Sequence, residues 1–127
     1  MFYIEVLFFR YLILQEFFPS FTARPVTDDE VTHQEAIDAC AACRVGDHAD
    51  WALPSREQLL SLIDLSRYSP AIDPEAFPEI SGGWFWSSDL AAWSSASAWV
   101  VSFGYGNVSD VRRSDDGFAL AVRGAGQ

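Results

Sequence analysis

The residues best suited to hold a metal ion are two cysteines and two histidines. Cys40 and Cys43 lie in one predicted helix, and His33 stands about two helical turns before Cys40. Structural zinc sites need four such ligands, usually in closely spaced pairs, and His48 lies beyond the helix in a polar turn. We therefore expect no zinc site. A disulfide within one helical turn is strained, so both cysteines are expected to be reduced and to pack as small apolar residues.

Carboxylates are plentiful, but none stands in a catalytic pattern. Asp110, Asp115 and Asp116 are the candidates for a calcium site, although no EF-hand-like loop surrounds them. Neither histidine accompanies a G-x-S-x-G segment, and the glycine spacings of nucleotide-binding loops are missing. His33 suits a helix cap and His48 a solvated turn. We expect no catalytic residue, no cofactor and no metal, and hence a protein that is not an enzyme.

Charge and composition restrict the partners of this single-domain chain. Its 127 residues include 8 basic ones, all arginine, against 18 acidic ones, and the net charge is −10. Binding of nucleic acid through counterion release needs clustered basic residues, and anionic membrane surfaces repel an acidic protein. We therefore expect neither nucleic acid nor membrane as a partner. A strongly acidic surface can also imitate a phosphate backbone, so an acidic inhibitor of a host nucleic-acid-binding complex stays open as an alternative.

The first 18 residues are the most apolar stretch of the chain. Glu5, Arg10 and Glu16 interrupt this stretch, which argues against a transmembrane helix, and the marks of a signal peptide are missing. Its aromatic and β-branched residues predict one long strand or a strand pair that is apolar on both faces. We expect Met1–Phe18 to be either core or an assembly surface for a homo-oligomer or a larger virion assembly.

Two capping boxes predict two helices after this segment. Residues 19–29 read as a loop because proline and short polar residues cluster there. Thr32–Glu35 is the first capping box, and its helix is expected to run to about Arg44 and to be ended by Gly46. Ser55–Gln58 is the second. The apolar face expected for the second helix consists of Leu59, Leu60, Leu62 and Ile63.

From Gly82 onward the sequence has the period of two that is typical of strands. Strands are predicted at 84–87 and 99–103, and a tight turn at 104–107 returns the chain antiparallel through Val108–Arg113. A second turn precedes a last strand in which Phe118, Leu120 and Val122 share one face. We therefore expect an α+β domain, with two helices packed on a twisted antiparallel sheet and a C-terminal β-meander.

The segment 93–116 holds the candidate binding surface. Aromatic anchors, short polar side chains and arginines are enriched in recognition surfaces. The residues expected to contact a ligand are Trp93, Ser94, Tyr105, Asn107, Ser109, Asp110, Arg112 and Arg113. The alternative is an ordinary solvated sheet face with Trp93 buried.

Several ordered blocks resemble the Lcl C-terminal domain family. The run DWALPSREQLLSLID at 50–64 resembles its signature, and the blocks at 69–73, 77–78, 84–88, 98–108 and 119–123 follow in the family's order. The resemblance implies a C-type-lectin-like fold over 19–127, related to that of the formylglycine-generating enzymes. The copper-binding cysteine pair of those enzymes is missing, because no cysteine follows Cys43.

The same resemblance implies a function in binding. Members look like ligand-binding modules of bacterial surface proteins, with small copies in phages and prophages. Similar lectin-like domains are the variable proteins of diversity-generating retroelements, in which the segment matching 93–116 is diversified while the Trp, Val and Phe positions act as scaffold. The calcium-dependent sugar motifs of true C-type lectins are missing, so any sugar binding is expected to be metal-free.

We therefore expect a non-catalytic recognition module, a phage tail-associated or surface protein that binds a bacterial envelope glycan or protein. It is expected in the virion, or in the host-cell cytoplasm before assembly. A structural virion protein that docks through its N-terminal strand is the other alternative.

Overall fold

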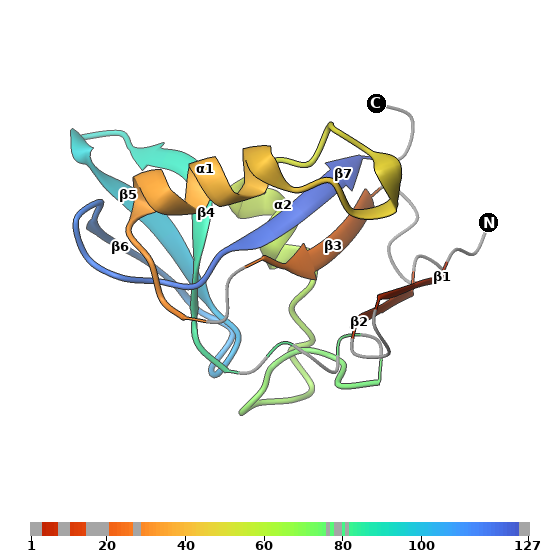
Figure 1. Ribbon diagram of the computed structural model, residues 1–127. Helices are drawn as coiled ribbons and strands as arrows, with labels where there is room; N and C mark the ends of the chain where they lie inside the picture. Colours follow the sequence, from red (N-terminus) through yellow and green to blue (C-terminus); the bar gives the residue numbers. More distant parts are fainter. Residues whose placement is uncertain are drawn as a thin grey trace.

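The computed structural model describes residues 4–7, 11–14, 21–26, 29–75, 77, 80 and 82–124, with the backbone alone at 4–7, 11–14, 21–25 and 124. The described residues contain two α-helices and antiparallel strands, which confirms the α+β class, and Figure 1 shows how they pack together. In chain order the elements are β1 (Ile4–Leu7), β2 (Tyr11–Leu14), β3 (Phe21–Pro25), α1 (His33–Ala42), the 3-10 helix η1 (Val45–Asp47), α2 (Arg56–Leu60), β4 (Trp84–Ala91), β5 (Ser94–Ser102), β6 (Val108–Arg112) and β7 (Leu120–Gly124).

The β-meander predicted near the carboxyl end consists of β4, β5 and β6. The three strands are antiparallel, with β5 in the centre. The first turn of the meander contains Trp93, and the second covers 103–106, where Gly106 adopts a φ of 77°. A positive φ suits glycine, which explains why the predicted tight turn falls there.

The expected loop at 19–29 was wrong in part, because Phe21–Pro25 forms β3. This strand pairs antiparallel with β7, from Phe21 opposite Gly124 to Pro25 opposite Leu120. β7 therefore belongs to a two-stranded sheet with β3 and is not a strand of the meander. Proline is tolerated at the end of a strand, and the partner strand lies about one hundred residues away in the chain, so local sequence gave little sign of the pairing.

The N-terminal segment contains a strand pair, one of the two forms predicted for it. β1 and β2 are antiparallel, from Ile4 opposite Leu14 to Leu7 opposite Tyr11, and form a two-stranded sheet of their own. The proposed division of the chain after residue 18 stays a prediction.

Both capping boxes are confirmed. The Thr32 hydroxyl accepts the Glu35 amide, and the Glu35 carboxylate accepts the Thr32 amide; Ser55 and Gln58 repeat the arrangement at α2. The first helix ends at Ala42, two residues earlier than expected, because the backbone is already extended at Cys43. Gly46, with a φ of 68°, lies in η1.

The described residues form two hydrophobic clusters. One contains Leu59 and Leu62 of the α2 region, packed with Phe85, Val101 and the predicted apolar face of the last strand. The other lies beneath α1. It contains Ala36 and Cys40 of that helix, Trp86 and Val100 of the meander, and Trp51 and Leu53 from the segment before α2. Because Phe85 and Trp86 are neighbours on β4, and Val100 and Val101 on β5, the clusters occupy opposite faces of the meander.

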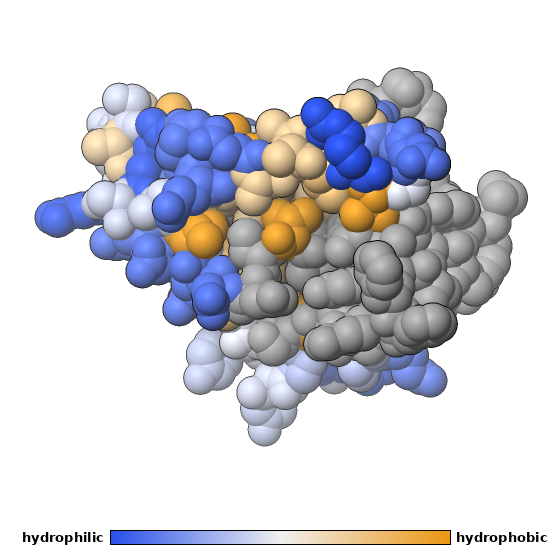
Figure 2. All heavy atoms as spheres, viewed as in Figure 1, coloured by the Kyte–Doolittle hydropathy of each residue, from blue (hydrophilic) through white to orange (hydrophobic). Residues whose placement is uncertain are grey.

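On the face shown in Figure 2, hydrophilic residues gather over the start of α1 and over β5 and β6, and hydrophobic colour appears in separate spots. Leu60, predicted to lie on the apolar face of α2, is exposed instead.

Candidate functional site

The pleat of β5 and β6 decides which candidate residues share a face. Paired residues in an antiparallel sheet point to the same side. Trp99 is opposite Asp110, and Ser97 is opposite Arg112. Ser97 and Trp99 have the same parity on β5 as Val101, which packs in the cluster that contains Leu59 of α2. The four side chains therefore lie on the α2 side of the meander. This surface, together with Trp93 and Arg56, is called the open face below.

Trp93 stands at the end of the open face. It lies in the β4–β5 turn and is 66% exposed, which excludes the alternative in which it is buried. Its ring meets the ring of the partly buried Trp99 edge-on, with centroids 5.5 Å apart and an interplanar angle of 84°. Edge-to-face pairs of this kind are stabilising. Trp93 therefore presents an exposed ring whose position is supported by a second ring.

Arg56 covers the same tryptophan from α2. Its guanidinium carbon lies 4.8 Å from the centre of the Trp99 ring, a cation–π contact. The Trp99 ring thus connects the turn that bears Trp93 to the start of α2. A positive charge is held beside the aromatic pair in a protein whose net charge is strongly negative.

A β-bulge in β4 holds the start of α2 in this place. The pairing of β4 with β5 shifts between Trp86 and Leu90. Within the shifted stretch the Ser88 amide donates to the Pro54 carbonyl (2.7 Å), and the Asp89 carboxylate accepts the Arg56 amide (2.7 Å). Bulges commonly redirect a strand in this way. The bulge therefore anchors the residue that lies over Trp99.

Two of the predicted ligand residues lie on the opposite face. Ser109 is paired with Val100, which belongs to the cluster beneath α1. Arg113 also points to α1: its Nε donates to His33 Nδ1 (2.9 Å) and its Nη2 to Gln34 Oε1 (3.4 Å). The side chains of Arg112 and Arg113 therefore point to opposite faces of the meander.

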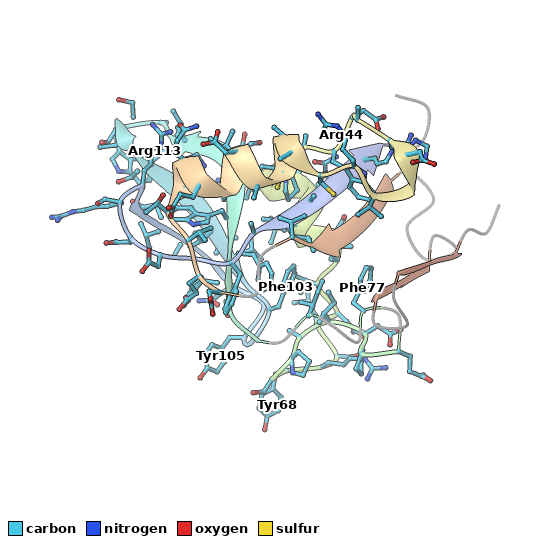
Figure 3. All side chains as sticks on the ribbon, in the orientation of Figure 1. Arg44, Tyr68, Phe77, Phe103, Tyr105 and Arg113 are labelled. Carbon is cyan, nitrogen blue, oxygen red and sulfur yellow. The ribbon has the colours of Figure 1, made fainter. Side chains whose placement is uncertain are left out.

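Two other predicted residues lie at the far end of the sheet. Tyr105 and Asn107 belong to the β5–β6 turn, while Trp93 and Ser94 are at the other end of β5. The nine residues of β5 span eight steps of about 3.4 Å, so its two ends lie roughly 27 Å apart. Figure 3 shows Tyr105 and Arg113 at opposite ends of the meander. The eight predicted residues therefore do not form one surface, and the role of each stays a prediction.

The far end carries a second exposed surface. Tyr105 is 77% and Tyr68 78% exposed, and both project from the same edge of the molecule in Figure 3. The loop bearing Tyr68 is fastened to the turn, because the Ser69 amide donates to the Gly104 carbonyl (2.6 Å).

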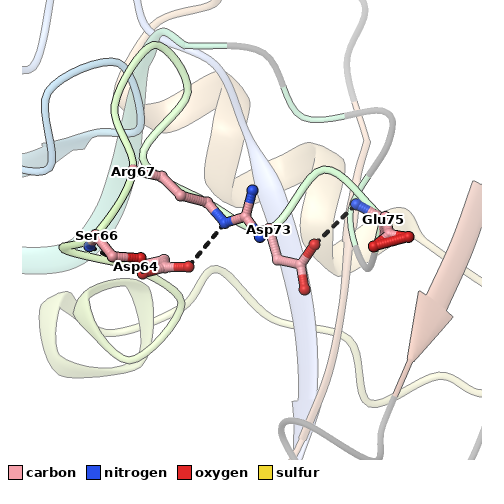
Figure 4. Close-up of polar contacts among 5 residues, drawn as sticks. All are labelled: Asp64, Ser66, Arg67, Asp73 and Glu75. Carbon is pink, nitrogen blue, oxygen red and sulfur yellow. Dashed lines mark hydrogen bonds and ion pairs between the residues drawn. The ribbon is translucent and has the colours of Figure 1, made fainter.

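Local bonds order the loop that carries Tyr68. The Asp64 carboxylate accepts from Ser66 and from Arg67 Nε (2.8 Å), and the Asp73 carboxylate accepts the Glu75 amide (Figure 4). The bonds from Ser66 and Arg67 lower the pKa of Asp64.

His33 is a buried member of the α1 side. Its Nε2 lies 2.8 Å from the Ser87 carbonyl oxygen, and its ring meets Trp86 edge-on at 5.0 Å. Because Arg113 donates to Nδ1, that nitrogen carries no proton, and Nε2–H donates to Ser87. Burial lowers the pKa of His33; the bond to Ser87 opposes this shift and the charge of Arg113 adds to it.

The cysteines are free thiols, as predicted. Cys40 is buried and lies 3.6 Å from the Leu120 carbonyl oxygen, and burial together with Cys43 raises its pKa to about 12. Among the residues that the structure describes, His, Cys, Asp and Glu form no group of three or more able to hold a metal ion. In that same part of the chain, no helix is both long and apolar enough to cross a membrane.

Comparison with known proteins now identifies the family. The sequence matches the Lcl C-terminal domain family over residues 16–123, most of the chain. The protein therefore belongs to this family, and the recognition made from the ordered sequence blocks is confirmed. Among curated proteins, none matches the chain.

Three residues of the open face are not among the predicted ligand residues: Arg56, Ser97 and Trp99. The sequence predicts Trp99 as scaffold and Arg56 only as the first residue of the second helix. The alternation of β5 indicated that Trp99 and Val100 face opposite sides. No sequence signal indicated that Arg56 would reach Trp99, because that contact joins segments 43 residues apart.

Proposed function

We propose that this protein is a non-catalytic recognition module, of C-type-lectin-like fold, that binds a bacterial envelope glycan or protein on its open face. Membership of the Lcl C-terminal domain family supports the class of fold. We place the protein in a virion as a tail-associated protein, or in the host cell before assembly.

The observation that carries this proposal is the exposed Trp93 ring supported by Trp99. An aromatic side chain that is held in place before binding loses little conformational freedom when a ligand stacks on it. Asp110 and Arg112, on the same face, supply an acceptor and a donor for hydroxyl or amide groups. A stacked ring with polar groups beside it is an arrangement suited to sugars and to extended peptide.

A binding screen with matched variants tests the proposal. The wild-type protein is applied to an array of bacterial surface glycans and cell-envelope fractions, and every retained component is tested again with Trp93→Ala and Tyr105→Ala. Both residues are exposed aromatics in turns of the meander, but they lie at opposite ends of it. We expect Trp93→Ala to weaken binding by about tenfold or more, and Tyr105→Ala to change it by less than about twofold.

Arg112→Gln is a second variant of the open face, because Arg112 lies on it beside Ser97. Thermal unfolding of each variant separates loss of binding from loss of fold. Loss of binding in Tyr105→Ala with Trp93→Ala unaffected moves the site to the far end of the sheet. Wild-type binding in both Trp93→Ala and Arg112→Gln excludes the open face.

A further inference from the structure

The contact between His33 and Arg113 joins the start of α1 to the end of β6. His33 is 1% exposed, and each of its ring nitrogens has a partner: Arg113 Nε donates to Nδ1, and Nε2–H donates to Ser87 O. The backbones are joined at the same point, because the His33 amide donates to the Arg113 carbonyl (3.1 Å). The fixed tautomer leaves no place for a second ring proton.

The partner of His33 is continuous with the open face. Arg113 directly follows Arg112, and its amide donates to the Ala96 carbonyl of β5 (2.9 Å). Asp110 and Arg112 precede it on the same strand and point to the other side of the sheet. A change in the position of Arg113 therefore acts on the strand that carries two residues of the open face.

Protonation of His33 is incompatible with this contact. A proton on Nδ1 removes the acceptor that Arg113 uses and sets two positive charges side by side. From α1, the neighbouring Gln34 is neutral, and Glu35 bonds Thr32. From β4, the ring meets the uncharged Trp86 and the Ser87 carbonyl. In the described part of the chain no carboxylate forms an ion pair with His33, so Arg113 is the charge that the imidazolium meets.

We propose that the His33–Arg113 contact is a proton-sensitive clasp: uptake of a proton by His33 releases Arg113, loosens the end of β6 and weakens ligand binding on the open face. The first part concerns the fold alone, and the effect on binding rests on the function proposed above. Histidine is the side chain whose protonation changes over mildly acidic pH, and the chain has only two, so His48 supplies a control.

Amide hydrogen exchange tests the clasp without any ligand. The reporters are the amides of His33 and Arg113, which donate to Arg113 O and Ala96 O. The comparison amides are those of Ala52 and Val122, which bond each other's carbonyls elsewhere in the fold. After correction for intrinsic exchange, we expect protection of the two reporters to fall about tenfold between pH 7.5 and pH 5.0, because the open state binds the proton of His33 more readily than the closed state. The comparison amides should change less than about twofold.

Two variants complete the design. His33→Gln keeps a donor for Ser87 and an acceptor for Arg113 but does not titrate, so its reporter amides should show no pH dependence. His48→Gln should behave like the wild type. Equal pH dependence in wild type and His33→Gln overturns the clasp. An equal fall at Ala52 and Val122 overturns it too, because the change is then global unfolding.

The effect on binding is measured with the array component that the wild type retains at pH 7.5. We expect at least about fivefold weaker retention at pH 5.0 in the wild type and pH-independent retention in His33→Gln. If the reporters open in acid while retention is unchanged, the clasp does not regulate the site. If no array component is retained at any pH, the proposed function fails, and the exchange experiment still decides the clasp.

Discussion

Replacement of Trp86 by phenylalanine measures how much of the fold depends on one indole. Trp86 is fully buried in the cluster beneath α1, and its Nε1 donates to the Val31 carbonyl (2.8 Å). The same carbonyl accepts the Gly117 amide, so it keeps one hydrogen bond after the change. The indole also lies so close to Gly117 that a β-carbon there would be 3.0 Å from Nε1, which shows how tightly this side of the ring is packed.

The expected loss of stability has three parts. The smaller ring leaves about 40 Å³ empty, which costs about 1 kcal/mol at about 24 cal/mol per Å³. The apolar atoms that are no longer buried account for about another 1 kcal/mol. Loss of one hydrogen bond, without leaving Val31 unpaired, adds about 0.5–1.5 kcal/mol. Trp86→Phe should therefore lower the free energy of unfolding by about 2–4 kcal/mol.

Urea unfolding provides the measurement, and Trp84→Phe is the matched control. Trp84 lies two residues earlier on β4 and has the same parity, but it is 36% exposed, and its indole makes no hydrogen bond within the described residues. We expect the control to lose less than about 1 kcal/mol. Equal losses in the two variants, or a loss below about 1 kcal/mol in Trp86→Phe, would show that this account of the core is wrong.

Three further predictions concern a thiol, a cap and an ion pair. Because burial raises the pKa of Cys40 to about 12, a thiol reagent at pH 8 should modify only Cys43 in the native protein and both residues in urea, and Cys43→Ser should leave no fast-reacting thiol. Ser55→Ala should lower the free energy of unfolding by about 1 kcal/mol and Ser55→Asp should restore it, as measured in urea; no loss in the alanine variant contradicts the role of the cap. The hydrogen bond from Arg123 lowers the pKa of Asp50 below its ordinary 3.8, so the folded protein binds this proton less readily than the unfolded chain, and the stabilisation is lost as pH falls from about 4 through the folded value. In an acid titration, the free energy of unfolding of Asp50→Asn should fall less steeply over this pH range than that of the wild type. An equally steep fall in both proteins argues against a stabilising Asp50–Arg123 pair.

Local features were the most predictable. Thr32–Glu35 and Ser55–Gln58 were identified as capping boxes because a cap depends on residues within one turn of each other. The β5–β6 hairpin followed from alternating apolar residues on both sides of a glycine turn. The burial of Trp86 and Val100 likewise follows from strand alternation.

Contacts between distant segments were less predictable. The pairing of β3 with β7 joins segments about one hundred residues apart, and the expected loop at 19–29 was wrong in part for that reason. The separation of Trp93 from Tyr105 depends on the length of β5, which begins at Ser94, whereas the sequence predicted a strand only at 99–103.

The sequence by itself determined the family, the two helix starts and the hairpin, because each depends on residues that are neighbours in the chain or on an ordered set of motifs. The tertiary structure decided which side chains meet: Arg56 over Trp99, Trp93 against Trp99, and Arg113 on His33. Such contacts depend on how helices, strands and a β-bulge pack in three dimensions, and this packing is set by the shape of the whole core rather than by the spacing of any one motif.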